Sequence, residues 1–252
     1  MIAISVIGLL VGFLSGMFGK GGSAIATPLL HLAGVPALVA VASPLPAVVP
    51  STLLAAVPYW RAKHIDMRLV KLGAAFGVPA TVLGAYLTHW INGTVLVVAT
   101  DAVILALAIR LLFYRHGKPR ESNDASTHLW RIGAVTTVIG LAGGLLANSG
   151  GFLLAPLFIV LLGIQTRRAL GSSLVLSSIL AIPGTIVHAQ LGHINWAITL
   201  VFGVASVPLA LVGANVALRT KSERIEWMYA LLLIVVSVVS VAQLVQAPWE
   251  TG

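Results

Sequence analysis

The chain has 252 residues, of which 58% are hydrophobic and only 9% are charged, and its formal net charge is +8. Average soluble domains carry about 25% charged residues, so this composition excludes a water-soluble fold. The basic residues lie in short loops between apolar stretches, which membrane topology explains better than a nucleic-acid partner.

Ten apolar stretches follow one another along the chain, and eight are roughly 16–23 residues long, close to the length that spans a bilayer. The other two, 23–33 and 152–163, would reach only about 17 Å as helices. The stretches are 2–19, 23–33, 39–59, 69–89, 94–113, 132–147, 152–163, 169–188, 196–218 and 226–246. Because the order of lengths repeats, we predict an all-α integral membrane protein with two repeats, each with a Gly/Pro-broken short helix and about four membrane-spanning helices.

Each short stretch belongs to a break in the apolar pattern. The first break runs from Gly16 to Pro28 and contains a lysine, and the second runs from Gly143 to Pro156. Glycine loosens the helical backbone and proline removes a donor. Paired breaks of this kind in matching halves indicate the binding site of a transporter.

The two halves also match residue by residue. Four residues between Gly12 and Pro28 are identical to the residues 128 positions later, between Gly140 and Pro156. Further along the chain the offset between identical residues becomes 129 positions. The clearest later pairs are Gly34 with Gly163, Ala40 with Ala169, Ser43 with Ser172, His64 with His193, Pro79 with Pro208 and Gly84 with Gly213. The constant offset favours a duplication, with a first repeat at 1–114, a cytoplasmic linker at 115–130 and a second repeat at 131–252.

The positive charges predict how these repeats cross the membrane. With loop 60–71 in the cytoplasm, 14 of the 15 Lys and Arg residues lie on the cytoplasmic side, whereas loops 34–38, 90–93 and 189–195 carry none. Loops 60–71 and 189–195 correspond but fall on opposite sides, so the repeats are predicted to be inverted. Both termini are then outside the cytoplasm, and the tryptophans fall at span ends, as an interfacial belt requires.

Lys20 is the one basic residue outside the cytoplasmic set. A lysine deep in the membrane needs an anion, and the helix expected to begin near Ser23 would attract one through its N-terminal N–H groups. The expected site therefore includes Lys20, Gly21, Gly22 and Ser23. Alternatively, residues 2–19 reach about 27 Å as a helix, and Lys20 then extends to the cytoplasmic face.

The second break offers amide, hydroxyl and backbone donors that suit an oxyanion: Asn148, Ser149, Gly150 and Gly151. Ser and Asn also cap helices, which is the alternative role for these residues. Ser43, Ser172 and Ser173 open the next helices as further candidates, with small-residue helix packing as their alternative.

Asp101 lies in the stretch 94–113 and is a candidate for proton coupling or for pairing with Lys20, unless it sits at the interface. His64 and His193 are either pH-sensitive gates or, more in keeping with their place, polar loop residues. His188 and His193 lack further clustered ligands, so no metal site is expected. The sequence contains no recognisable catalytic motif, and neither enzymatic activity nor a cofactor is expected.

Two copies of a Gly-x-x-x-Gly…Gly-Gly-x-x-x-x-x-Pro segment, each followed by a short Ala/Ser-led helix, resemble the sulfite exporter TauE/SafE family. The resemblance covers about residues 8–245. It is carried by Gly12, Gly16, Gly19, Gly21, Gly22 and Pro28, by Gly140, Gly144, Gly150, Gly151 and Pro156, and by Gly84-Ala85 and Gly213-Ala214. Family members have a richer glycine run where this chain reads Gly-Lys-Gly-Gly and Ala-Asn-Ser-Gly-Gly. The resemblance implies export of sulfite, organosulfonates or related small anions across the cytoplasmic membrane.

These observations together predict a secondary transporter of a small oxyanion in the cytoplasmic (inner) membrane, with its site between the two breaks. One rival function is a cation or proton permease that uses Asp101 and the histidines. Another is a membrane assembly or signalling subunit without transport of its own. The partners expected are the anionic substrate and the lipid bilayer, and a homodimer is left open.

Overall fold

The computed structural model describes residues 1–19, 23–87, 105–106, 109–110, 125–145 and 151–246, and throughout these ranges the regular structure is helical. The helices are α1 (Ile2–Phe18), α2 (Ser23–Leu32), α3 (Ala37–Ala42), α4 (Leu45–Arg61), α5 (Met67–Leu87), α7 (Ala125–Leu145), α8 (Gly151–Val160), α9 (Thr166–Gln190), α10 (Trp196–Arg219) and α11 (Ser222–Gln246). The predicted all-α fold is confirmed, and the two short apolar stretches form separate helices of 10 residues each.

One predicted span contains a short interruption. The stretch 39–59 forms a helical segment long enough to cross a membrane, Val39–Arg61, and Ser43 and Pro44 separate its α3 part from its α4 part. Pro44 and Pro46 have no backbone N–H, so they cannot donate to the carbonyls of the preceding turn. In the second half, Ser173 stands where Pro44 stands in the first half, and α9 runs unbroken through it.

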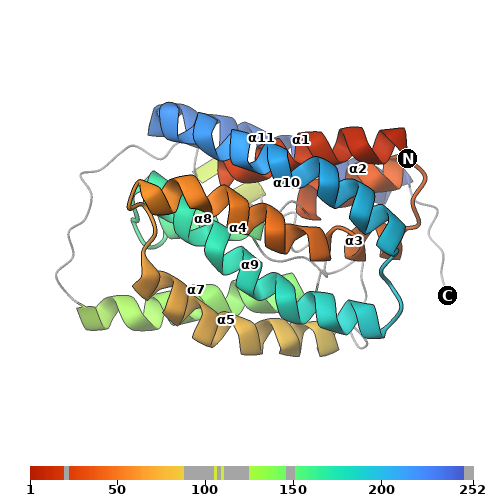
Figure 1. Cartoon of the computed structure of the whole chain (residues 1–252). Helices are drawn as coiled ribbons and strands as arrows, with labels where there is room; N and C mark the ends of the chain where they lie inside the picture. Colours follow the sequence, from red (N-terminus) through yellow and green to blue (C-terminus); the bar gives the residue numbers. More distant parts are fainter. Residues whose placement is uncertain (20–22, 88–104, 107–108, 111–124, 146–150, 247–252) are drawn as a thin grey trace.

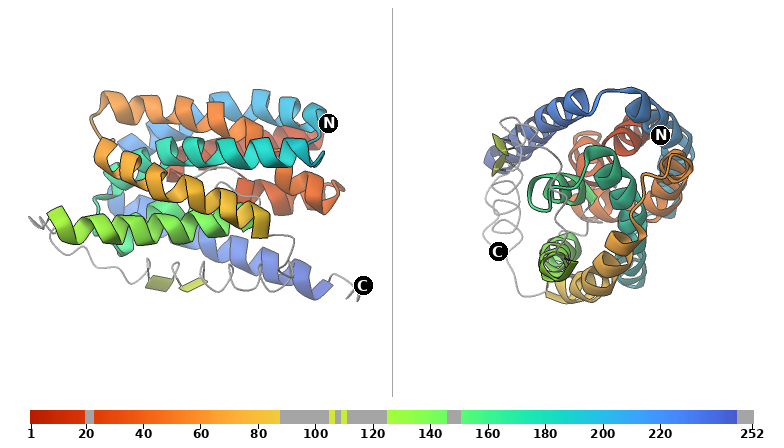
Figure 2. Two further views of the ribbon diagram at one scale, coloured as in Figure 1. Left: turned by 90° about the horizontal axis from the view of Figure 1, so that it is seen from below. Right: turned by 90° about the vertical axis from the view of Figure 1, so that its left-hand side faces the viewer.

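The helices run along a common direction and form one bundle (Figures 1 and 2). Neighbouring helices contact one another in the order α1, α10, α4, α9, α5 and α7. In the sequence repeat, α1 corresponds to α7, α10 to α5, and α4 to α9. The first three helices of this order therefore match the last three taken in reverse, as expected for two related halves. The loop between α4 and α5 and the loop between α9 and α10 lie at opposite ends of the bundle (Figure 1).

The two outer helix pairs approach through matching glycines. A Cβ atom added to Gly12 or Gly16 of α1 would overlap the carbonyl oxygen of Ser206 or Ala210 of α10. The corresponding Gly140 and Gly144 of α7 stand in the same way against Gly77 and Thr81 of α5. The reciprocal contacts also match, because Gly213 faces the Phe13 carbonyl and Gly84 faces the Leu141 carbonyl. Small residues allow this close backbone approach in membranes, where helices associate by packing rather than by exclusion of water.

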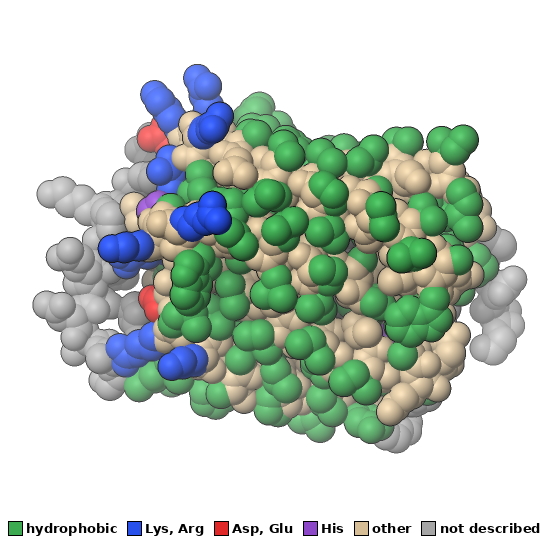
Figure 3. All heavy atoms as spheres, in the orientation of Figure 1, with side chains coloured by type: hydrophobic (Ala, Val, Ile, Leu, Met, Phe, Trp, Pro, Cys, Tyr) green, Lys and Arg blue, Asp and Glu red, His purple; other side chains and the backbone are tan. Residues whose placement is uncertain are grey.

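The outer surface suits a lipid environment. Within the described ranges, four helical segments are long and apolar enough to cross a membrane: Val39–Arg61, Met67–Leu87, Thr166–Gln190 and Trp196–Arg219. Large apolar side chains such as Leu200 and Val204 are 68% and 70% exposed. Figure 3 shows hydrophobic side chains over most of one face, with the visible Lys and Arg side chains gathered at one end. That end carries the loop between α4 and α5 (Figure 1).

The tryptophans for which the structure describes a position are exposed near helix ends. Trp60 lies in the last turn of α4, Trp196 begins α10, and Trp227 lies in the second turn of α11, with exposed fractions of 60%, 61% and 56%. Trp130 is also exposed, and the guanidinium of Arg131 lies over its ring at 5.9 Å. These positions are those of an interfacial aromatic belt.

Candidate functional site

The two predicted breaks are junctions between a long helix and a half-length helix. α1 ends at Phe18 and is capped by Gly19, whose φ of 65° is left-handed and whose N–H bonds to the Ser15 carbonyl, and α2 begins at Ser23. α7 ends at Leu145, and α8 begins at Gly151. The helix start predicted near Ser23 is therefore confirmed. The remaining candidates of these junctions, together with Asp101, lie outside the described residues: Lys20, Gly21, Gly22, Asn148, Ser149 and Gly150.

Both half-length helices begin inside the bundle and run outward. A helix of 10 residues is about 15 Å long, half the hydrocarbon thickness. α2 leads to the loop before α3 at one end of the molecule, and α8 leads to the loop before α9 at the opposite end (Figure 1). Consequently the N-terminal ends of α2 and α8 lie inside the bundle, and their C-terminal ends lie toward opposite ends of it. Unpaired N–H groups and the positive end of the helix dipole make such a terminus an anion-binding element.

Among Ser43, Ser172 and Ser173, Ser173 is the one that lies at the first junction. Its hydroxyl is buried and close to two acceptors, the carbonyl oxygens of Gly19 at 2.7 Å and Leu170 at 2.9 Å. A Cβ atom on Gly19 would stand 2.6 Å from the Ser173 Oγ, and its backbone conformation also disfavours other residues. Ser173 thus attaches α9 to the end of α1, beside the predicted site.

Ser43 and Ser172 lie elsewhere, although they correspond in the repeat. The Ser43 Oγ accepts a hydrogen bond from the Asn195 N–H at 3.0 Å, and the Ser172 Oγ accepts one from the Asp66 N–H at 2.9 Å. Asn195 and Asp66 belong to loops at opposite ends of the bundle (Figure 1). The structure therefore gives each serine the role of holding a loop and does not bring the two together in one site.

A buried carboxylate near the first turn of α9 was not singled out in the sequence. Glu226 of α11 is 4% exposed and accepts a hydrogen bond from the Thr166 hydroxyl, at the positive end of α9. The neighbouring Arg167 donates from Nη2 to the Thr220 carbonyl at 3.4 Å. Glu226 is the first residue of the predicted apolar stretch 226–246, and its sequence position does not show that it is buried against α9.

The loop histidines differ in their surroundings. Burial, and then the charges of Arg167 and Arg168, lower the pKa of His64 below its usual value of 6.5. His64 is therefore protonated only at a lower pH than an ordinary histidine. At the other end, the Nδ1 atoms of His188 and His193 lie 3.1 Å apart. No group of three or more potential metal ligands occurs in the described part of the chain.

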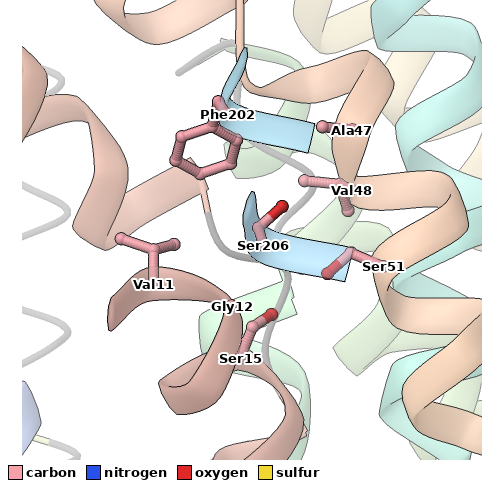
Figure 4. Close-up of a pocket in the computed structure, with 8 residues that line it drawn as sticks. All are labelled: Val11, Gly12, Ser15, Ala47, Val48, Ser51, Phe202 and Ser206. Carbon is pink, nitrogen blue, oxygen red and sulfur yellow. The ribbon is translucent and has the colours of Figure 1, made fainter. Parts of the chain in front are cut away.

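A serine-lined pocket between α1, α4 and α10 was also not predicted. It is lined by Ser15, Ser51 and Ser206 together with Val11, Gly12, Ala47, Val48 and Phe202 (Figure 4). In the sequence the second serine follows the first by 36 positions, and the third follows the second by 155 positions. Each lies among small residues, as serines at ordinary helix contacts do. Only the fold shows that they converge.

Comparison with known proteins identifies the family. The model of the sulfite exporter TauE/SafE family matches residues 4–240, nearly the whole chain. The chain belongs to the TauE/SafE family. A "Probable membrane transporter protein YjnA" of Bacillus subtilis (strain 168) is 25% identical over 93% of this chain and 97% of the relative. A "Probable membrane transporter protein" of Xylella fastidiosa (strain Temecula1) is 26% identical over 92% of this chain and 91% of the relative.

No solved structure matches the chain. The family and the relatives, together with the apolar helices, support a multi-pass membrane transporter. They agree with the family resemblance expected from the glycine motifs.

Proposed function

We propose that this TauE/SafE protein is a secondary transporter that exports a small oxyanion, such as sulfite or an organosulfonate, from the cytoplasm. The observation that carries the proposal is the pair of half-length helices α2 and α8, which begin inside the bundle and run to opposite ends. Two helix N-termini within a low-dielectric bundle attract negative charge. The name of the family model supports a sulfur oxyanion as the substrate.

The substrate would bind between the two junctions. In this proposal Lys20 supplies a positive charge, and Gly21, Gly22, Ser23, Asn148, Ser149, Gly150 and Gly151 supply backbone and side-chain donors. The Ser173 hydroxyl fixes the α1 end of the first junction. Export of a monovalent anion from a negative cytoplasm gains about 2.3 kcal/mol per 100 mV, so the proposal requires no second energy source.

Flux through reconstituted protein tests this function. Proteoliposomes loaded with labelled sulfite are expected to release it many times faster than protein-free vesicles, and an excess of an unlabelled sulfonate should slow the release. A potential that is negative inside should accelerate efflux. Proton or potassium flux without sulfite release would instead support the cation permease.

The charge distribution supports an orientation with the basic end in the cytoplasm and both termini outside. Cysteines introduced at Ala62 and Leu191, which are exposed in the two loops at opposite ends, should react with an impermeant thiol reagent from opposite sides of the membrane. The chain contains no native cysteine, so each label reports one position. Reaction of both cysteines from the same side would contradict the inverted arrangement.

A further inference from the structure

The pocket between α1, α4 and α10 has the size and lining of a site for one small ion. Its volume is about 10 Å³, close to what a single water requires. Ser15, Ser51 and Ser206 come from three different helices and are 2%, 4% and 1% exposed. Figure 4 shows the hydroxyls of Ser15 and Ser51 pointing toward each other across the space between the helices.

The hydroxyl of Ser15 is the feature that indicates a ligand. Its Oγ atom is buried and has no hydrogen-bond partner in the protein. A buried hydroxyl without a partner is costly, so a bound species in the pocket would relieve that cost. The Ser206 Oγ lies 3.4 Å from the Gly203 carbonyl, and a hydroxyl that donates its proton there keeps its lone pairs for a ligand.

The electrostatic setting favours a cation over an anion. All eight lining residues are uncharged, so the preference for a cation comes from the hydroxyl oxygens and from the helix end beside them. Ser15 lies in the last turn of α1, which ends at Phe18, and the C-terminal end of a helix carries partial negative charge. The ends of broken helices coordinate sodium ions in other transporters in this way. With neutral oxygen ligands and no carboxylate, the site suits a monovalent rather than a divalent ion.

The pocket has no counterpart in the second half. The positions that correspond to Ser15, Ser51 and Ser206 are Gly143, Leu180 and Gly77. There the leucine side chain fills the space, since a Cβ atom on Gly77 would stand 2.9 Å from the Leu180 Cδ2. The corresponding helices of the second half therefore pack against one another without a polar pocket. Helix packing alone does not explain why the first half has three serines at these positions.

We infer that Ser15, Ser51 and Ser206 bind one monovalent cation, sodium, next to the junction between α1 and α2. The ion connects the last turn of α1 to α4 and α10 and so stabilises the closely packed α1–α10 pair at the end where the anion would bind. This gives the transporter a site for a coupling ion that is separate from the proposed anion site.

Thermal unfolding of the purified protein tests the ion site directly. The melting temperature should rise with sodium chloride and saturate, and should not rise with choline chloride at the same concentration. Ser15→Ala and Ser51→Ala should each weaken the apparent sodium affinity by about tenfold or more, because a ligand to a charged group is lost. Ser177→Ala is the matched control, since its hydroxyl is also buried and without a partner but lies outside the pocket.

A double variant covers the case in which the alanine variants fail to fold. Ser51→Leu with Ser206→Gly recreates the packing of Leu180 over Gly77, so it should fold and should not respond to sodium. Equal melting of the native protein in sodium and choline chloride would overturn the site, as would an unchanged sodium response in Ser15→Ala. Because this measurement needs no anion, a sodium response without sulfite flux would leave the ion site standing and refute only the proposed substrate.

Discussion

Replacing Gly16 or Gly144 with valine is expected to prevent the native protein from forming and to reduce the monodisperse fraction after purification to a small part of the normal yield. Overpacking of a core usually costs about 1–3 kcal/mol, and more where nothing can move aside. Here the obstacles are backbone carbonyl oxygens, those of Ala210 and Thr81, which cannot change rotamer as a side chain can. Each helix pair would have to separate along its length.

Gly184→Ala is the matched control for these variants. It also lies within a long helix, but its added Cβ would meet only the Leu45 Cδ1 at 3.9 Å, an ordinary contact. Size-exclusion profiles and melting temperatures of the three variants in detergent should separate them clearly. A normal profile for both valine variants would show that the helix pairs do not depend on this close approach.

The fold was largely predictable because membrane solvation makes apolar length and glycine placement informative. The two short helices were expected from stretches too short to span a bilayer, and they begin at Ser23 and Gly151. Matching glycines at a constant offset indicated a duplication, and in the structure the corresponding Gly16 and Gly144 stand against corresponding helices. The break between α3 and α4 was missed because the stretch is apolar throughout, although Pro44 was a usable signal.

The site was less predictable, because a serine in an apolar helix gives no indication of what its hydroxyl faces. Ser43 and Ser172 were assigned to the anion site from their position after the breaks, and the structure shows them bonded to loops. Ser15 drew no attention among its glycine neighbours, and its hydroxyl is one of several in the described residues that are buried without a partner and the one that lies in the pocket. Such differences depend on which helices meet, which a local pattern does not contain.

The described contacts link the two proposed sites through α1. Ser15 lies in the pocket, and the Gly19 N–H, four residues later, bonds to the Ser15 carbonyl. The Gly19 carbonyl in turn accepts from Ser173 of α9. A change in how α1 packs on α4 and α10 would therefore move the start of the first junction, which is how an ion in the pocket could influence anion binding.

Replacing Lys20 with methionine is expected to weaken binding of sulfite or a sulfonate roughly 10- to 150-fold. Methionine retains an apolar stem but removes the charge, and the loss of a hydrogen bond to a charged group costs about 1.5–3 kcal/mol. Lys20 follows Gly19 and precedes the first turn of α2, so its charge would add to the positive end of that helix. Anion affinity is measured in detergent at fixed pH and salt.

Lys20→Arg and Lys63→Met are the control variants for Lys20→Met. Arginine keeps the charge but presents a planar fork, so it should retain part of the affinity. Lys63 lies in the loop between α4 and α5, and methionine there should leave affinity within about twofold, because exposed charges are well screened. If Lys20→Met also stays within twofold, Lys20 extends to the membrane surface, and the helix N-termini with their amide and hydroxyl neighbours must recognise the anion without it.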